Sequence, residues 1–343
     1  MNMELTELTR ALSAIPGPSG FESPVSEYIA EYVRPFADDV KIDVMGTLLA
    51  WKRCGKTGAK TVLLDAHMDE VGFIVTAVEE GGFLKFSTLG GIDARILPAL
   101  EVKVLSEDGP LFGVIGTMPP HALKAGDSDK AVDADDLYID VGLSQEEAEK
   151  RVPPGTPAVY AAGCDTMAGG RLCGKSLDDR VCAAIQVKAF EDLCGRDLNV
   201  DLCLMISTQE EVGGRGAVTG AWGADPDYAI VSDVTFDKGT DGKSVATVLG
   251  KGAAIAVGPN MNTAMTRELV RLAEEKGIPY QIEVCPGRSG TNAEEIQISR
   301  LGVATALVSL PIRYMHTPIE CALPEDMESV RRLVAEYVAS MEA

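Results

Sequence analysis

The sequence predicts an α/β protein in which a mostly parallel, mixed sheet is flanked by helices and interrupted by a small inserted β-rich domain. Three observations lead to this fold class. An unbroken apolar run precedes His67, the pattern over residues 71–163 changes to short alternating runs, and helical and strand patterns alternate after residue 164. A chain of 343 residues with 46% hydrophobic residues is long and apolar enough to bury a full core.

The expected elements follow in chain order. Residues 3–14 have the pattern of a short amphipathic helix that a Pro-Gly-Pro sequence ends, and a second helix is expected at 23–35. Residues 61–65 have an unbroken apolar centre at 62–64, which is typical of a strand buried on both faces. The later expected elements are a helix at 178–194, strands at 200–207 and 228–232, a helix at 265–276, a strand at 303–310 and a last helix starting near Pro324.

The stretch from residue 71 to residue 163 differs from its surroundings. Its short alternating runs, such as 83–86 and 102–104, are separated by glycine-rich breaks, which favours a β-rich module. We therefore expect a main domain made of residues 1–70 and 164–343, with residues 71–163 inserted into it.

Charge and cysteine usage exclude several classes of partner. The net charge of −21 would repel nucleic acid and anionic membranes, so neither is expected to bind. No apolar run is long enough to span a bilayer, and no secretory signal is visible. None of the eight cysteines forms a Cys-x2-Cys pair, and several lie within apolar runs. They are expected to be reduced and mostly buried, which predicts a cytoplasmic protein.

Acidic residues and histidines follow the predicted strands where each strand ends. In an open α/β sheet, ligands bind beyond the carboxyl ends of the strands, so a parallel sheet would bring these side chains to one edge. The set suits two divalent metal ions and a hydrolytic water, because its ligand atoms are imidazole nitrogens and carboxylate oxygens. Its members are His67, Asp178, Glu210, Glu211, Asp233 and His316.

Each of these motifs also has a purely structural interpretation. Asp178 and Asp179 could cap a helix, Glu210 and Glu211 before two glycines could form a solvated turn, and a single histidine after a strand is usually structural. Their joint occurrence at five strand or helix ends favours a shared site. His121 is interpreted as a loop residue of the inserted module, with a substrate or subunit contact left open.

At this point the motifs resemble those of a known family, the tetrahedral (TET-type) glutamyl/leucyl aminopeptidases, which are dinuclear metallopeptidases. The resemblance covers essentially the whole chain. It is carried by the segments at 17–20, 66–72, 113–116, 174–180, 209–213, 290–293 and 316–320. Asn292 departs from an aspartate that is common in the family, and Ile92 departs from a frequent aromatic residue. Neither is a ligand position, so these departures concern fine specificity.

The resemblance implies a zinc-peptidase-like fold. Residues 1–70 and 164–343 would form the catalytic metallopeptidase domain, and residues 71–163 would form an inserted small β-barrel for dimerisation. The resemblance also implies a role for each site residue. Asp178 would bridge two metal ions, with His67 and Asp233 completing one site and Glu211 and His316 the other. Glu210 would be the general base, and Asp69 would orient His67. The ions would be zinc, with cobalt or manganese as alternatives. The enzyme would remove N-terminal residues from short peptides and would assemble as dimers into a dodecamer.

Other functions remain open from the sequence. A related dinuclear carboxypeptidase or N-acyl amino acid deacylase would need a cation for a substrate carboxylate, and Arg180, Arg288 and Arg313 are candidates. A cellulase is disfavoured by the aromatic content of only 5%. An inactive metal-binding scaffold is disfavoured by the intact Glu210. The preferred N-terminal residue is also open: an acidic one would need a cation such as Lys251, Arg288 or Arg313, and an apolar one would need an apolar wall.

Overall fold

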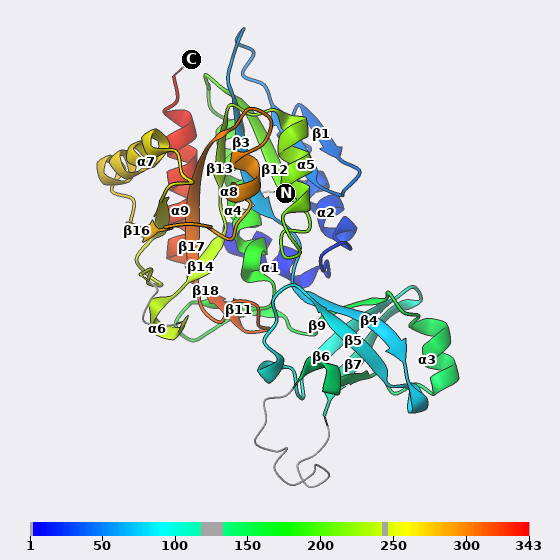
Figure 1. The fold of residues 1–343 in the computed structure, drawn as a ribbon. Helices are drawn as coiled ribbons and strands as arrows, with labels where there is room; N and C mark the ends of the chain where they lie inside the picture. Colours follow the sequence, from blue (N-terminus) through cyan, green and yellow to red (C-terminus); the bar gives the residue numbers. More distant parts are fainter. Residues whose placement is uncertain (1–2, 118–132, 242–245, 343) are drawn as a thin grey trace.

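The computed structural model describes residues 3–117, 133–241 and 246–342. A large sheet with helices on both faces forms the main body, and a smaller β-barrel lies to one side of it (Figure 1). This architecture confirms the fold class that the sequence predicts.

A nine-stranded sheet forms the centre of the main body, in the order β1-β2-β12-β3-β13-β17-β15-β16, with β14 paired to β17. Four neighbouring strands in its middle are mutually parallel: β12 (Asp201–Ser207), β3 (Thr61–His67), β13 (Tyr228–Val231) and β17 (Ala304–Ile312). The remaining strands are β1 (Asp39–Ile42), β2 (Leu48–Lys52), β14 (Val234–Phe236), β15 (Ala253–Val257) and β16 (Tyr280–Val284). β2 is antiparallel to β12, and β15 is antiparallel to β17.

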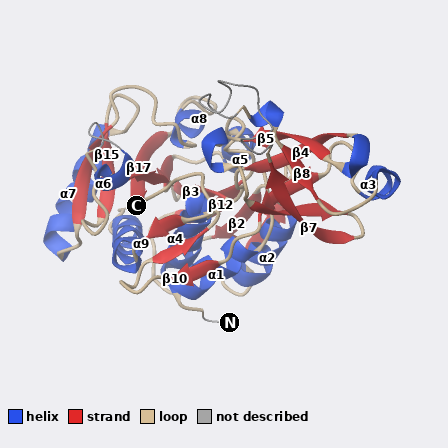
Figure 2. Ribbon diagram, turned by 90° about the horizontal axis from the view of Figure 1, so that it is seen from below, coloured by secondary structure: helices blue, strands red, loops and turns tan. Residues whose placement is uncertain are grey.

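Helices cover both faces of this sheet, so its central strands are buried on both sides (Figure 2). On β3, Val62 and Leu64 pack into one apolar cluster and Leu63 packs into a second cluster on the opposite face. The first face is covered by α1 (Leu5–Ala14), α2 (Ser23–Val33), α4 (Leu177–Cys194), α7 (Thr263–Lys276) and α9 (Pro324–Ala339). The second face is covered by α5 (Arg215–Ala224) and α8 (Ala293–Gln297).

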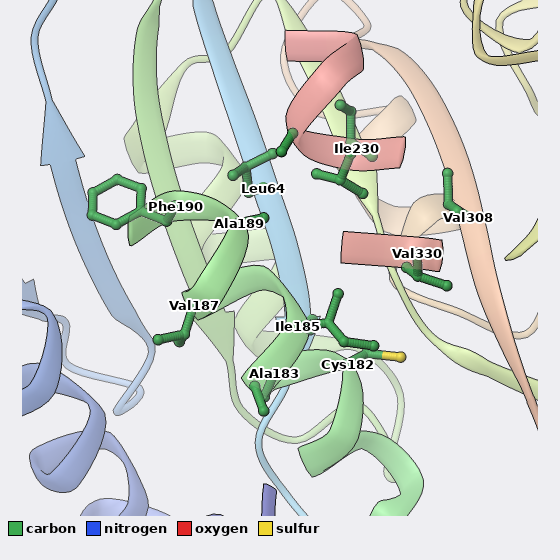
Figure 3. Packing of buried hydrophobic residues seen from close by; sticks show 14 of the residues in the cluster. Leu64, Cys182, Ala183, Ile185, Val187, Ala189, Phe190, Ile230, Val308 and Val330 are labelled. Atoms are coloured by element: carbon green, nitrogen blue, oxygen red, sulfur yellow. The ribbon is translucent and has the colours of Figure 1, made fainter. Parts of the chain in front are cut away.

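Helix α4 is the central element of the first face. Its side chains Ile185 and Phe190 are fully buried and pack in the cluster that includes Leu64, Ile230 and Val308 of the sheet (Figure 3). Because α4 is surrounded by protein, the residues at its first turn are held in a fixed position relative to the strand ends.

The inserted module is a closed barrel with the strand order β4-β5-β8-β7-β6-β9. Phe73 lies at its centre and makes edge-to-face contacts with Phe86 and Tyr160, with ring centroids 5.3 and 5.4 Å apart. The strands are β4 (Gly72–Val78), β5 (Leu84–Leu89), β6 (Glu101–Ser106), β7 (Gly109–Gly116), β8 (Tyr138–Asp140) and β9 (Pro157–Tyr160), and the outer end carries α3 (Gln145–Arg151).

A third, small sheet of β10 (Cys164–Thr166), β11 (Leu172–Gly174) and β18 (Glu320–Ala322) has no counterpart in the sequence-based expectations. Its strands are only three residues long, which is too short for a periodic pattern to reveal. Short α6 (Lys238–Asp241) and 3-10 turns at Glu80–Gly82, Ala94–Ile96 and Ala134–Asp136 complete the elements. Within the described residues, no helix is long and apolar enough to cross a membrane.

Candidate metal centre

The parallel strands bring the predicted site residues to one edge of the sheet. His67 is the last residue of β3 and is in register with Ser207, the last residue of β12. Glu210 and Glu211 lie in the loop that follows β12, and Asp233 lies two residues after the end of β13. His316 comes a few residues after β17. Since neighbouring parallel strands end at the same edge, residues more than 240 positions apart in the chain meet there.

Asp178, in the first turn of α4, lies between the two histidines. Its Oδ1 is 3.2 Å from Nε2 of His67, and its Oδ2 is 3.1 Å from Nε2 of His316. Asp178 is only 5% exposed and His67 only 2%. The two oxygens of one carboxylate thus face two different imidazole nitrogens, which is the arrangement that a carboxylate shared by two cations requires.

The other predicted ligands lie in two groups of donor atoms, one of which contains Asp178. Glu211 Oε1 lies 3.2 Å from Nε2 of His316. Ligand atoms of His67, Asp178 and Glu211 all lie within 4.8 Å of one another, and so do those of His67, Asp179 and Asp233. Asp179 is a member that the sequence analysis did not assign to the metal site. The donor set of imidazole nitrogens and carboxylate oxygens suits divalent ions such as zinc, cobalt or manganese.

Asp69 is fully buried and contacts several residues of the site. The outer nitrogen of His67, Nδ1, lies 3.2 Å from the backbone carbonyl oxygen of Asp69 and 3.3 Å from its Oδ1. The same carboxylate accepts hydrogen bonds from the backbone N–H groups of Glu210 and Glu211, at 3.0 and 3.1 Å, and from the hydroxyl of Ser19 at 2.6 Å. Asp69 therefore contacts one imidazole and also the backbone of the two consecutive glutamates.

Glu320 has a corresponding structural role on the other side, which the sequence analysis missed. Its carboxylate accepts hydrogen bonds from the backbone N–H groups of His316, at 2.7 Å, and of Asp178, at 3.1 Å. Nδ1 of His316 lies 2.6 Å from the carbonyl oxygen of Gly91. The one sequence signal for Glu320 was an acidic residue four positions after a ligand histidine, which is too common to single out.

The electrostatics of the cluster favour a bound cation. Burial alone would raise the pKa of Asp178, but the two histidines hold it well below its usual range. Burial would lower the pKa of His316, but Asp178 and Glu211 raise it to about 12. Burial raises the pKa of Asp233 well above its usual value, and the neighbouring Asp179 raises it further. Several carboxylates thus share a buried space with two imidazoles, and divalent cations would offset their repulsion.

Glu210 differs from its neighbour Glu211 in its surroundings. Its side chain lines the cavity without bridging to either histidine. Burial raises the pKa of Glu210 to about 8, and the nearby Glu211, Asp178 and Asp69 add to the shift while His67 opposes it. A carboxylate with a pKa near neutrality beside a metal site can take up and release a proton under ordinary conditions.

The site opens into a cavity of about 360 Å³. No arginine or lysine of the described residues lines it. The guanidinium of Arg180 is fully buried and donates to the carbonyl oxygens of Leu12 and Ile15 at 2.7 and 3.0 Å. Arg313 pairs with Asp237 at 2.6 Å, and Arg288 pairs with Glu294 at 2.7 Å.

The candidate cations from the sequence are therefore engaged elsewhere or lie outside the cavity, including the exposed Lys251. His121 lies outside the described residues.

Comparisons with known proteins agree with this geometry. A model of the M42 glutamyl aminopeptidase family matches residues 46–333. A lysyl aminopeptidase of Pyrococcus furiosus is 35% identical and aligns over 95% of this chain and 94% of its own length. The crystal structure of a TET aminopeptidase from a marine sediment archaeon of the Thaumarchaeota has a TM-score of 0.93 at 32% identity, covering 98% and 97% of the two chains. The TET1 peptidase of Pyrococcus horikoshii, described as assembling into a tetrahedron or a large octahedral shell, has a TM-score of 0.87 at 31% identity, covering 98% and 100%.

Proposed function

The chain belongs to the M42 glutamyl aminopeptidase family of metal-dependent peptide hydrolases, and on this premise we propose how its residues carry out the reaction. It is an aminopeptidase, and we propose that it removes single N-terminal residues from short peptides at the cluster around Asp178. The observation that carries the proposal is the placement of the two oxygens of Asp178, 3.2 and 3.1 Å from the Nε2 atoms of His67 and His316.

We assign two divalent ions to this cluster. Asp178 would contact both, His67 and Asp233 would hold one, and Glu211 and His316 would hold the other. Zinc is the first choice for such a donor set, with cobalt and manganese as alternatives. When bound, the ions supply Lewis-acid chemistry, lowering the pKa of a water molecule and polarising the scissile carbonyl group. Asp69 would keep His67 in the orientation that presents Nε2 to the metal.

Glu210 is assigned as the general base. It would accept a proton from the attacking water and later donate that proton to the leaving amine. Its position in the cavity wall, next in sequence to the assigned ligand Glu211, supports this role. The carboxylates of the cavity also suit a substrate whose free α-amine is a cation. The related carboxypeptidase and deacylase reactions are less well supported, because no arginine of the described residues lines the cavity.

A homo-oligomer is proposed as the working form. The P. horikoshii TET1 peptidase, which matches 98% of this chain, is described as forming a tetrahedron or a larger shell. We propose that residues 71–163, which contain the barrel, mediate dimerisation and that dimers build a dodecamer. Exposed apolar side chains of the barrel, Phe112 and Val114, support a contact there. Light scattering should give a mass near twelve times 36.3 kDa, whereas a mass near one subunit would contradict the assembly. A cytoplasmic location is proposed because all eight cysteines are free.

The first experiment is hydrolysis of a panel of aminoacyl anilides by chelator-treated protein, with zinc, cobalt or manganese added back. We expect release that depends on metal and is abolished by N-acetylation of the substrate, because the acetyl group removes the cationic amine. Cleavage of N-acyl amino acids, with no release from the free-amine anilides, would instead point to the deacylase reaction.

A further inference from the structure

The cavity that contains the metal cluster has a second group of polar side chains that the reaction does not use. Glu283 of β16, Thr235 of β14 and Ser309 of β17 line it together with residues of the cluster. The side chain of the substrate's N-terminal residue must occupy some part of this cavity while its amide bond lies at the metal cluster. The residues beyond the cluster therefore determine which side chains fit.

Glu283 is turned toward this cavity by the strand that carries it. β16 is the last strand of the sheet, and its side chains alternate between the two faces. Ile282 and Val284 are 41% and 66% exposed on one face, while Glu283 points to the cavity on the other. This order is the reverse of an ordinary half-buried strand, in which the apolar residues face inward.

Within the described structure, only one of the two carboxylate oxygens of Glu283 has a hydrogen-bond partner. Thr235 donates a hydrogen bond to Oε1 at 2.5 Å, whereas Oε2 is buried and has no hydrogen-bond partner in that part of the chain. Burial raises the pKa of Glu283, while the side chains of Thr235 and Ser309 beside the carboxylate oppose this shift. Leaving a buried carboxylate oxygen without a donor is unfavourable, and a cation placed beside it would remove that cost. No lysine or arginine of the described residues lines the cavity, so none of their side chains supplies this cation, whereas a cationic side chain of the substrate would.

We propose that Glu283, supported by Thr235, is the residue that selects a cationic side chain, such as that of lysine or arginine, at the N-terminus of the substrate. The inference rests on the proposed aminopeptidase function and specifies its substrate class. A glutamyl side chain would bring a second carboxylate next to Glu283, which like-charge repulsion disfavours. A leucyl side chain would leave Oε2 buried without a partner.

The test compares lysyl with norleucyl anilide, because the two side chains share the same four-carbon chain and differ at its end in the ammonium group. With the metal-loaded full-length protein, we expect kcat/KM for the lysyl compound to be at least roughly tenfold higher, the value of one charge-assisted hydrogen bond. Glu283→Gln should remove this advantage, mainly by raising KM for the lysyl compound, while the norleucyl compound is unaffected. The matched control Glu79→Gln, on the exposed surface of the barrel, should change neither substrate.

A second variant tests the same proposal by reversing the charge at position 283. Glu283→Lys should reverse the preference, so that glutamyl anilide becomes the better substrate of the pair. If Glu283→Gln lowers activity on all anilides equally and lowers the melting temperature, Glu283 protects the sheet edge only and the inference is overturned. Release from leucyl or glutamyl anilide, with the lysyl compound disfavoured, would overturn it while leaving the aminopeptidase function intact. The absence of release from every anilide would contradict the proposed function itself.

Discussion

At the scale of single residues, the buried carboxylate of Asp69 shows how the site is held in place. It is fully buried, yet its two oxygens contact the His67 imidazole, two consecutive backbone N–H groups and the Ser19 hydroxyl. Although burial raises the pKa of Asp69, the hydrogen bonds to His67 and Ser19 lower it overall, so the carboxylate is retained in its charged form. A charged acceptor beside the outer nitrogen of a ligand histidine fixes the ring and increases its basicity.

We predict that Asp69→Asn weakens metal binding by roughly 10- to 100-fold, because an amide cannot accept from all of these donors at once. Competition with a chelating dye would measure the affinity. Asp39→Asn, on an exposed edge strand, is the control and should leave the affinity unchanged. Equal affinities in the Asp69 variant and the parent would show that Asp69 does not orient the ligand.

Glu210→Gln tests the general base. We expect kcat to fall by roughly 10²- to 10⁴-fold, because glutamine cannot accept the proton of the attacking water. Metal content, measured by plasma mass spectrometry, should remain that of the parent, since the ligand assignment excludes Glu210. Unchanged turnover would remove Glu210 from the mechanism, whereas a loss of metal would make it a ligand.

At the scale of elements, the start of α4 is bonded to the N-terminal segment of the chain. Lys175 lies two residues before the start of α4, and its ammonium contacts Glu70 at 2.7 Å, with both side chains only 1% exposed. Arg180, in the first turns of the helix, donates to carbonyl oxygens of residues 12–17 and lies 3.9 Å from the same glutamate. These contacts connect β3, α4 and the segment after α1 behind the metal cluster, so the geometry of Asp178 depends on them.

We expect Glu70→Gln to lower the free energy of unfolding by about 3–5 kcal/mol, because it leaves the Lys175 ammonium buried without its counter-charge. Denaturant titration would measure this. The matched control is Glu31→Gln, which removes a pair that is exposed on the surface, and its cost should be about 0–1 kcal/mol. Similar costs for the two variants would show that the buried pair contributes no more than a surface pair.

At the scale of the whole molecule, negatively charged side chains are concentrated at the metal cluster. The loops after β12 and β13 and the start of α4 place Glu210, Glu211, Asp233 and Asp178 there, in a protein whose net charge is already −21. Their mutual repulsion opposes folding, and bound divalent ions would offset it. Folding and metal binding are therefore expected to be coupled.

Removal of the metal by a chelator should lower the melting temperature. A ligand present at 100 times its dissociation constant stabilises the folded state by about 2.7 kcal/mol, and each ion would contribute separately. Calorimetry with and without the chelator would measure the shift. Adding metal back should restore the parent value, and equal melting temperatures in both states would contradict the coupling.

The sequence alone determined the type and order of the long elements and the identity of the candidate ligands. These depend on local periodicity and on which residues follow each strand, and β3, β12, β13 and β17 appear where their apolar runs predict them. The tertiary structure decided the strand order, the direction of each side chain and the partners of each charge. Only the tertiary structure shows that Arg180 is buried away from the cavity, that Glu320 accepts hydrogen bonds from two backbone N–H groups and that Glu283 faces the cavity. The physical reason is that such contacts join residues far apart in the chain, and local patterns carry no information about which distant partner satisfies a buried charge.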